Sequence, residues 1–278
     1  MKIVTPVPVR PAPARPGEAI LPHTDLGNPA ARIWIVTSAA LPWMTGTGVN
    51  PLLRAAYLTR NRDTEAGGRV TLLLPWLEKA RDRAAVYGDA DIFSRREEQA
   101  EYIRSWLRDT ADMPDAAEKL DIRWYVGWQE RLENSVYGMG DITGLIPEDE
   151  VDVVVLEEPE HLNWYRAPGE PWTSKFKHVV GIVHTNYFVY ALEQPGAIIR
   201  APAIKLLCSW MCRSHCHRII KLSGTLGTFA PEKELVQNVH GVRNGFLVEG
   251  KSLAARLRSG ADGRGIFSAD APPKIYFI

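Results

Sequence analysis

Residues 151–187 constrain the fold more strongly than any other part of the sequence. They contain two short apolar runs, residues 151–156 and His178–Val183, that are rich in β-branched side chains and have no helical period. Runs of this kind are typical of strands buried on both faces, as in a parallel sheet packed between helices. The chain is therefore expected to be an α/β protein with a Rossmann-like, doubly wound parallel sheet.

Polar side chains follow both runs. Ligands of open α/β sheets bind at the carboxyl ends of the strands, so this edge is the leading candidate site. On the residues alone, the histidine after the second run is equally well explained as a hydrogen-bonded strand end, and the glutamates as a solvated acidic loop. The side chains concerned are Glu157, Glu158, Glu160 and His161 after the first run, and His184, Thr185, Asn186 and Tyr187 after the second.

Strands and helices are expected to alternate along most of the chain, giving six or seven strands. Residues 76–79 and 127–147 are expected to be irregular, the second because it contains several glycines. Further strands are expected at 33–37, 70–75, 121–125, 218–222 and 235–239, and helices at about 50–60, 97–107 and 197–215.

A glycine-containing loop is expected between the first strand and the first helix. Gly46 and Gly48 precede Asn50, the expected helix cap, and Pro51, which suits a first turn. A helix amino terminus directs backbone N–H groups toward an anion or a sugar. The pattern lacks the third glycine of the dinucleotide fingerprint, and a plain tight turn explains it equally well.

The charge balance disfavours nucleic acid as a partner. Lys and Arg together number 33, as do Asp and Glu, so there is no net basic field. Three cysteines cannot all pair within one chain, which favours a reducing compartment. No apolar run approaches the roughly 20 residues of a membrane-spanning helix.

Two residue groups allow a sharper and a plainer interpretation. Cys208, Cys212 and Cys216 share a helical face, but structural zinc sites favour pairs on turns and not three thiols spread along a helix. Small, partly buried thiols facing the sheet explain them better, and no metal site is expected. The nine tryptophans are expected mainly in the core and in clefts. The alternative is a lipid-facing surface, for which the candidates are Trp124, Trp128, Trp164 and Trp172.

Generic motifs leave the chemistry of the site open. The chain has no G-x-S-x-G nucleophile elbow and no H-E-x-x-H zinc motif. His184 or the acidic cluster would suit a sugar-transfer enzyme, which needs an imidazole or a carboxylate beside an acceptor hydroxyl. A module that only binds a polar ligand would use the same groups as hydrogen-bond partners.

Several long strings resemble one family. The strings IWIVTSAALPWMTGTGVNPLLRAAYL, VTLLLPWL, EEQAEYIRSWL, LEEPEHLNWY, KHVVGIVHTNY, CHRIIKLS and NVHGV are similar to the amino-terminal half of the digalactosyldiacylglycerol synthases. That family comprises plant and algal galactosyltransferases that make a chloroplast galactolipid. The similarity runs with gaps from about residue 32 to residue 246. Family members resemble retaining glycosyltransferases of the GT-B class, in which an amino-terminal domain holds the acceptor.

The resemblance implies roles for individual residues. His184 would be the catalytic residue at the reaction centre, and Gly46, Thr47 and Gly48 would form the loop near the donor phosphates and sugar. Gly241 would be a hinge. The acceptor side would be shaped by Glu157, Glu158, Glu160, His161, Asn163, Trp164 and Asn186.

The resemblance also implies substrates and a location. UDP-galactose would be the donor and monogalactosyldiacylglycerol the acceptor, with retention of configuration and without a cofactor. The protein would be peripheral to the chloroplast outer envelope membrane, with the galactolipid and the membrane surface as its partners.

The expected organisation has three parts. Residues 1–30 form a proline-rich, disordered tail, residues 31–247 the acceptor-side domain, and residues 248–278 a linker followed by KIYFI, the first strand of a donor domain that is otherwise missing. Little or no transferase activity is therefore expected of the chain alone. The alternative function is a non-catalytic module that binds galactolipid or a membrane surface.

Overall fold

The structure is a computed structural model of the chain, and it describes residues 26–89, 91–131, 134–165, 167–187, 197–239, 248, 250–252 and 254–255. Three expectations therefore lie largely or wholly outside the described residues. They are the tail before residue 26, the hinge at Gly241, and the linker and strand expected over residues 248–278.

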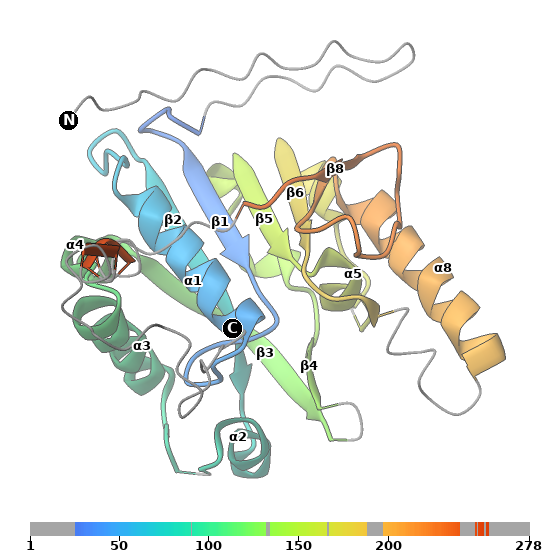
Figure 1. Cartoon of the computed structure of the whole chain (residues 1–278), viewed down its shortest axis with the longest axis horizontal. Helices are drawn as coiled ribbons and strands as arrows, with labels where there is room; N and C mark the ends of the chain where they lie inside the picture. Colours follow the sequence, from blue (N-terminus) through green and yellow to red (C-terminus); the bar gives the residue numbers. More distant parts are fainter. Residues whose placement is uncertain are drawn as a thin grey trace.

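An eight-stranded sheet runs through the described part of the molecule in the order β4-β3-β2-β1-β5-β6-β7-β8. All neighbouring strands are parallel except β3 and β4. The chain winds outward from β1 to β3, returns to β5 beside β1, and then winds outward in the other direction (Figure 1). The predicted doubly wound, Rossmann-like sheet is confirmed. The strands are β1 (Arg32–Val36), β2 (Arg69–Leu77), β3 (Asp121–Glu130), β4 (Ser135–Gly138), β5 (Val153–Glu157), β6 (His178–Val183), β7 (Arg218–Lys221) and β8 (Glu234–Val236).

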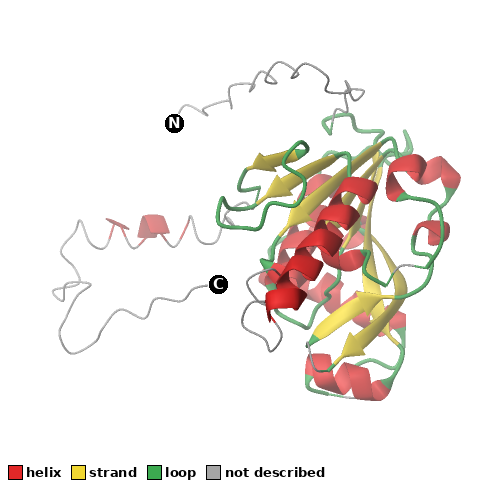
Figure 2. Cartoon of the chain, turned by 90° about the vertical axis from the view of Figure 1, so that its right-hand side faces the viewer, coloured by secondary structure: helices red, strands yellow, loops and turns green. Residues whose placement is uncertain are grey.

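Helices cover both faces of the sheet (Figure 2). Alternate side chains of β1 point to opposite faces: Ile33 and Ile35 pack with α1, α3 and α4, whereas Trp34 and Val36 pack with α5, α6 and α8. This explains why the central strands are apolar without alternation. The helices are α1 (Gly46–Thr59), α2 (Ala80–Tyr87), α3 (Arg96–Ser105), α4 (Pro114–Lys119), α5 (Pro159–Leu162), α6 (Trp172–Lys175) and α8 (Ala197–His215), with a π turn at Trp106–Thr110 and 3-10 turns at Thr143–Leu145 and Glu148–Glu150.

Two segments that were expected to be irregular, residues 76–79 and 127–147, are partly strand. Strand β2 continues to Leu77, and β3 continues to Glu130 before the chain returns as β4. Of the glycines that suggested a loop, Gly138 lies inside this hairpin, where it pairs with Gly127, whereas Gly140 and Gly144 follow β4. A Cβ at Gly138 would lie 2.8 Å from a side-chain carbon of Ile142, so the glycine makes room for close packing. Strand β4 is the strand that the count of six or seven missed.

The start of α1 also differs from the expectation. The helix begins at Gly46, and its cap is Thr45, whose Oγ1 accepts a hydrogen bond from the Gly48 N–H at 3.1 Å. Asn50 is therefore not the cap, and Pro51 lies inside the helix. Because proline has no N–H, it cannot donate to the carbonyl four residues earlier.

The cysteines face the sheet, as expected, but they are fully buried and not partly buried. Cys208 and Cys212 on α8, and Cys216 just after it, belong to the cluster between α8 and the sheet. Burial raises the pKa of all three thiols, so they stay protonated at neutral pH. Among the described residues, no group of three or more His, Cys, Asp or Glu side chains is placed to hold a metal ion.

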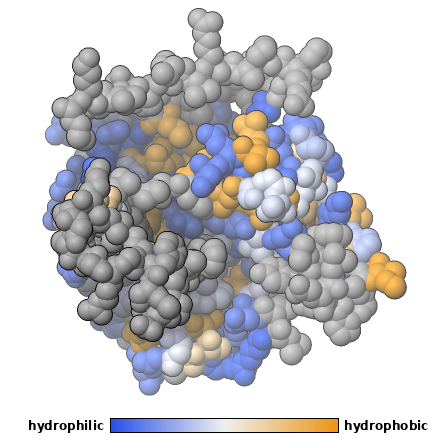
Figure 3. All heavy atoms as spheres, in the orientation of Figure 1, coloured by the Kyte–Doolittle hydropathy of each residue, from blue (hydrophilic) through white to orange (hydrophobic). Residues whose placement is uncertain are grey.

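The tryptophans divide between the core and one surface. Trp34 and Trp172 are fully buried, which confirms the core interpretation for these two and rules out Trp172 as a lipid-facing residue. Trp164 is half-buried. Trp210 on α8 is exposed. Apolar surface is visible at the right edge of the molecule (Figure 3). No helix in the described ranges is long and apolar enough to span a bilayer.

Candidate functional site

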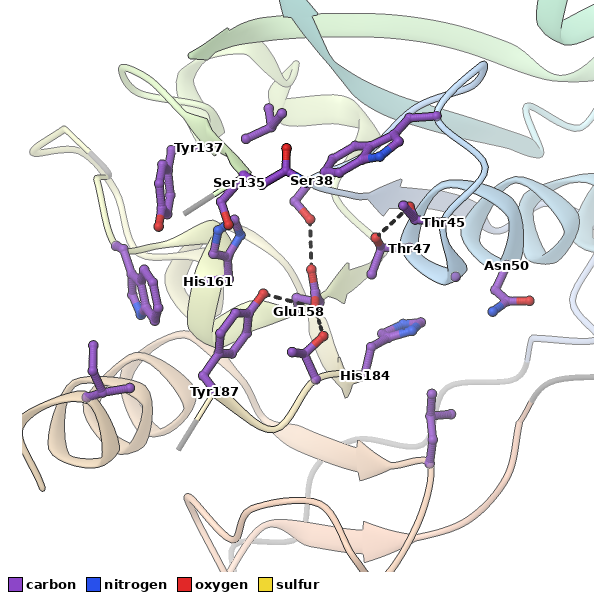
Figure 4. Close-up of a pocket in the computed structure, with 18 of the residues that line it drawn as sticks. Ser38, Thr45, Thr47, Asn50, Ser135, Tyr137, Glu158, His161, His184 and Tyr187 are labelled. Carbon is purple, nitrogen blue, oxygen red and sulfur yellow. Dashed lines mark hydrogen bonds between the residues drawn. The ribbon is translucent and has the colours of Figure 1, made fainter. Parts of the chain in front are cut away.

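A pocket of about 590 Å³ opens at the carboxyl ends of β1, β5 and β6. This is the point where the direction of winding changes, and ligands of open α/β sheets bind at such switch points. The walls come from the β1–α1 segment, the β3–β4 hairpin, the β5–α5 turn, the residues after β6, and α8 (Figure 4). The lining residues are Ser38, Trp43, Thr45, Gly46, Thr47, Asn50, Asn134, Ser135, Val136, Tyr137, Glu158, His161, Trp164, His184, Thr185, Tyr187, Arg200, Ile204 and Leu222.

The structure brings many of the predicted site residues together, although their roles stay predictions. His184 lines the same pocket as Gly46 and Thr47, which come from a different part of the chain. The predicted residues that line the pocket are Gly46, Thr47, Glu158, His161, Trp164 and His184. Those that do not line it are Gly48, Glu157, Glu160, Asn163 and Asn186.

Glu158 organises the floor of the pocket. Its carboxylate accepts hydrogen bonds from Ser38 Oγ at 2.9 Å, from Tyr187 Oη at 3.0 Å and from Thr185 Oγ1 (Figure 4). Glu158 is only 4% exposed, and its neighbours Glu157 and Glu160 are fully buried, so the interpretation as a solvated acidic loop is wrong. The Glu158 backbone has φ 60° and ψ 61°, a conformation that costs a non-glycine residue on the order of 1–3 kcal/mol.

Glu157 lies outside the pocket lining and contacts the ring of His184. Its Oε2 lies 2.5 Å from His184 Nε2, and its Oε1 accepts from Arg54 Nε at 2.7 Å. Burial raises the pKa of the Glu157 carboxyl, but the His184 hydrogen bond and the Arg54 charge outweigh burial, so the net pKa is lowered. Because a carboxylate only accepts, His184 Nε2 donates, and in the neutral imidazole Nδ1 is then the acceptor.

Aromatic rings form one wall of the pocket. The ring of His161 is stacked on Tyr187, with centroids 5.4 Å apart and an interplanar angle of 7°, and lies 4.5 Å from the ring of Tyr137. Trp164 packs 5.2 Å from Tyr187. Burial and the Glu158 charge raise the pKa of Tyr187, which keeps its hydroxyl protonated as a donor. Flat apolar faces beside hydroxyl groups and a carboxylate suit a ligand with polar edges and apolar C–H faces, such as a sugar.

The amino terminus of α1 forms the opposite wall. The hydroxyls of Thr45 and Thr47 are 3.2 Å apart, and Gly46 and Asn50 complete this wall. Gly48 has a structural role, because a Cβ there would lie 2.5 Å from the Trp43 carbonyl oxygen.

The remaining predicted residues lie outside the lining. Asn163 donates to the Pro159 carbonyl at 2.7 Å and accepts from Trp172 Nε1 at 2.9 Å, which ties α5 to α6. Asn186 donates to the Thr225 carbonyl at 3.2 Å. Burial and the nearby Glu158 raise the pKa of Glu160 well above its usual value, so its surroundings favour the neutral form of this buried carboxyl.

Sequence reasoning missed several lining residues. Ser38 follows β1, so the rule that sites gather at the carboxyl ends of strands was sufficient to find it. Tyr137 and Ser135 lie on β4, in a segment expected to be a loop, and no signal in the sequence placed this strand against α5. Arg200 comes from α8, whose packing on the sheet had to be known first.

Comparison with known proteins finds several plant relatives. The chain is 43% identical over 240 residues to digalactosyldiacylglycerol synthase 1, chloroplastic, of Glycine max, which is 86% of this chain and 29% of that protein. It is 39% identical over 228 residues to synthase 2 of Lotus japonicus (82% and 47%) and 42% identical over 215 residues to synthase 2 of Arabidopsis thaliana (77% and 43%). The matched part is thus less than half the length of each of these relatives. No family model matches the chain.

Proposed function

We propose that this chain, a homologue of the digalactosyldiacylglycerol synthases over most of its length, is the acceptor-side part of a galactolipid galactosyltransferase of the GT-B class. Its donor would be UDP-galactose and its acceptor the sugar headgroup of monogalactosyldiacylglycerol, without a cofactor. It would act at the surface of the chloroplast outer envelope membrane; the relatives are named chloroplastic, which supports the organelle.

The proposed reaction exchanges one bond at the galactose C1 atom. The bond from C1 to the diphosphate oxygen of UDP-galactose breaks, a bond from C1 to the acceptor hydroxyl oxygen forms, and configuration is retained. UDP leaves with the electron pair of the broken bond, and its departing diphosphate oxygen takes the proton that the acceptor hydroxyl loses. His184, held by Glu157, would contact the acceptor hydroxyl or the transferred sugar through its Nδ1 atom.

One observation carries the proposal: His184 and the first turn of α1 line the same pocket. These groups come from strands on the two sides of the switch point, and both belong to the strings that resemble the family. The Glu158 carboxylate, its three hydroxyl donors and the aromatic wall give the same pocket the polar and flat apolar surfaces that a sugar ring requires.

The activity is tested in a chimera, because this chain spans only part of its relatives. Residues 32–239 replace the matched part of the Glycine max synthase, and transfer of galactose from UDP-galactose to monogalactosyldiacylglycerol is measured. His184→Ala is expected to lower kcat about 10²-fold or more, in the range of lost proton-transfer or electrostatic catalysis. The matched control is His178→Ala, at the other end of β6, which should leave kcat within about twofold.

A second measurement tests the binding role of the pocket in the chain itself. Soluble β-galactosylglycerol is titrated into the protein, and Glu158→Gln should weaken binding about tenfold because it disturbs the three hydroxyl groups around the carboxylate. Full transfer by the His184→Ala chimera would contradict the catalytic role. Binding of galactolipid vesicles by the chain, together with an inactive but folded chimera, would favour the alternative of a non-catalytic binding module.

A further inference from the structure

Helix α8 is apolar on two opposite sides. One side packs against the sheet through Ala201, Cys208, Met211 and Cys212. The other side faces outward, although a helix on the surface of a globular domain normally presents polar residues there. At 100° per residue, the outward apolar residues share one side of the helix. They are Ile198, Ile199, Leu206 and Trp210, whose side chains are 91%, 80%, 73% and 64% exposed, with exposed Pro202 between them.

This outer stripe (Ile198, Ile199, Pro202, Leu206 and Trp210) is too continuous to be scattered surface apolarity. Contiguous exposed apolar patches mark surfaces that contact a protein or a membrane. The space-filling view shows apolar surface protruding at the end of α8, on the right of the molecule (Figure 3).

The charges beside the stripe favour a lipid surface. Helix α8 has no Asp or Glu, and the exposed Arg200 and Lys205 lie on its two opposite borders. Long cationic side chains at the borders of an apolar face allow the stems to lie on lipid while the charges reach the headgroups. Arg213, nearer the end of the helix, is paired with Glu232 and adds little net charge.

The position of α8 connects the stripe to the site. Arg200 and Ile204, on the same helix, line the pocket that holds His184. A surface that rests on a bilayer through the outer stripe would therefore bring the mouth of the pocket close to the headgroup layer. This step rests on the proposed function, in which the acceptor is a lipid that stays in the membrane.

We propose that the outer stripe of α8 is a membrane-docking surface that lies in the headgroup region of a bilayer containing anionic lipid. Leu206 and Trp210 enter the boundary with the acyl chains, and Arg200 and Lys205 contact the headgroups. The chain then docks as a peripheral protein, and the acceptor headgroup enters the pocket from the side of α8.

A label on the stripe tests the placement. In Leu206→Cys, an environment-sensitive fluorophore is attached at the new thiol; the three native thiols are buried and protonated, so they do not compete. The control is Glu118→Cys on the exposed side of α4. Vesicles of phosphatidylcholine with phosphatidylglycerol, without galactolipid, should shift the emission of the label at position 206 to shorter wavelength. The label at position 118 should not shift.

Flotation of the protein with the same vesicles measures the contribution of the stripe. The double substitution Leu206→Glu and Trp210→Glu should weaken vesicle binding at least tenfold. Lys119→Glu on α4, which makes the same change of two units in net charge, should change it less than twofold. Circular dichroism checks that the double variant is folded. If it does not fold, the label at position 206 decides whether the outer stripe contacts the membrane, because that protein differs from the unmodified stripe at one residue.

The outcomes separate this inference from the proposed function. Equal vesicle binding by the double variant and the unmodified protein, or equal emission at the two labels, would overturn the membrane surface. An emission shift that depends on protein concentration without vesicles would assign the stripe to a second copy instead and also overturn it. Vesicle binding that needs the stripe, with a folded but inactive chimera that carries no substitution, would leave the docking surface in place and reject only the proposed reaction.

Discussion

At the scale of single residues, Glu157 and Glu160 are three positions apart and both fully buried, but their surroundings are opposite. Arg54 and His184 contact the Glu157 carboxyl, so its ionised form is stabilised in the folded protein. The Glu160 carboxyl lies near the Glu158 charge, and no hydrogen bond from another described residue reaches its oxygens. The same side chain is therefore an ion-pair partner at one position, whereas at the other its surroundings favour the neutral form.

Glu157→Gln should destabilise the protein by about 3–5 kcal/mol at neutral pH, because it leaves Arg54 without its buried partner. The folded-state pKa of Glu157 is lowered, so its contribution is present above the unfolded value near 4.5 and is lost as pH falls through the folded value. The stability difference from the unmodified protein should shrink below pH 4.5. Urea unfolding at several pH values measures it, with the exposed Glu118→Gln as control; a difference that does not change with pH would contradict the ion pair.

Glu160→Gln should have the opposite pH dependence. The folded-state pKa of Glu160 is raised, so folding is favoured below the unfolded value near 4.5, and stability is lost as pH rises above it. Relative to the unmodified protein, the variant should gain up to about 1.4 kcal/mol per pH unit above 4.5, until the folded-state pKa is reached. The same unfolding series measures this slope. A parallel pH dependence of the two proteins would mean that Glu160 is ionised in the folded state.

Gly48→Ala should destabilise the protein by about 1–3 kcal/mol, because the added carbon would lie 2.5 Å from the Trp43 carbonyl oxygen and the backbone would have to move. Gly46→Ala is the matched control, since its nearest neighbour would be 3.6 Å away. Thermal unfolding compares the two variants. Equal stabilities would show that the turn before α1 can shift at little cost.

At the scale of elements, α1 accommodates a proline through a side chain of β1. Pro51 cannot donate to the Thr47 carbonyl, and Thr37 Oγ1 donates to it at 2.6 Å instead. Both residues come from the segment that forms one wall of the pocket. The bond therefore fixes the first turn of the helix relative to the end of β1.

Thr37→Val should cost about 1 kcal/mol, because it leaves the part-buried Thr47 carbonyl without this donor. In a Pro51→Ala background the helix N–H returns and can donate to the same carbonyl, so Thr37→Val should cost clearly less. A double-mutant cycle by urea unfolding measures the coupling. If the two backgrounds gave the same cost, Thr37 would act through packing and not through this hydrogen bond.

The elements also show what the sequence can predict. The bounds of β6 and α8 were predicted as observed. The β-branched run of β6 is a signal that lies within the element itself, and α8 keeps its predicted bounds although Pro202 lies inside it. The predictions for the start of α1 and for the hairpin of β3 and β4 were wrong, because these features depend on contacts with residues outside the predicted element. Thr45 supplies the cap of one, and the fit of Gly138 against Ile142 permits the other.

The same limit applies to the candidate site. His184 and Glu158 follow strands that the sequence identifies, so the strand-end rule places both near a ligand. Whether a glutamate lines the pocket or lies beneath it depends on the turn after β5, where the positive φ of Glu158 directs consecutive side chains to different sides. No local pattern carries that information.

At the scale of the whole molecule, the pocket joins the two halves of the doubly wound sheet. The half that begins with β1 supplies Ser38 and the first turn of α1, and the half that begins with β5 supplies Glu158 and the residues after β6. Among the described residues, the bond from Ser38 to Glu158 crosses this boundary within the pocket. A ligand that contacts both walls should therefore stabilise both halves together.

Soluble β-galactosylglycerol, bound in the pocket, should slow amide hydrogen exchange in residues 38–50 and in residues 184–187 to a similar extent. Strand β8, at the edge of the sheet, should not change. At a concentration of 100 times Kd, binding should add about 2.7 kcal/mol of stability. Hydrogen exchange measured by mass spectrometry with and without the compound gives both results, and Glu158→Gln should weaken them together because its carboxylate links the two walls. Protection of only one half would mean that the ligand contacts a single wall, and that the pocket does not act as one site across the switch point.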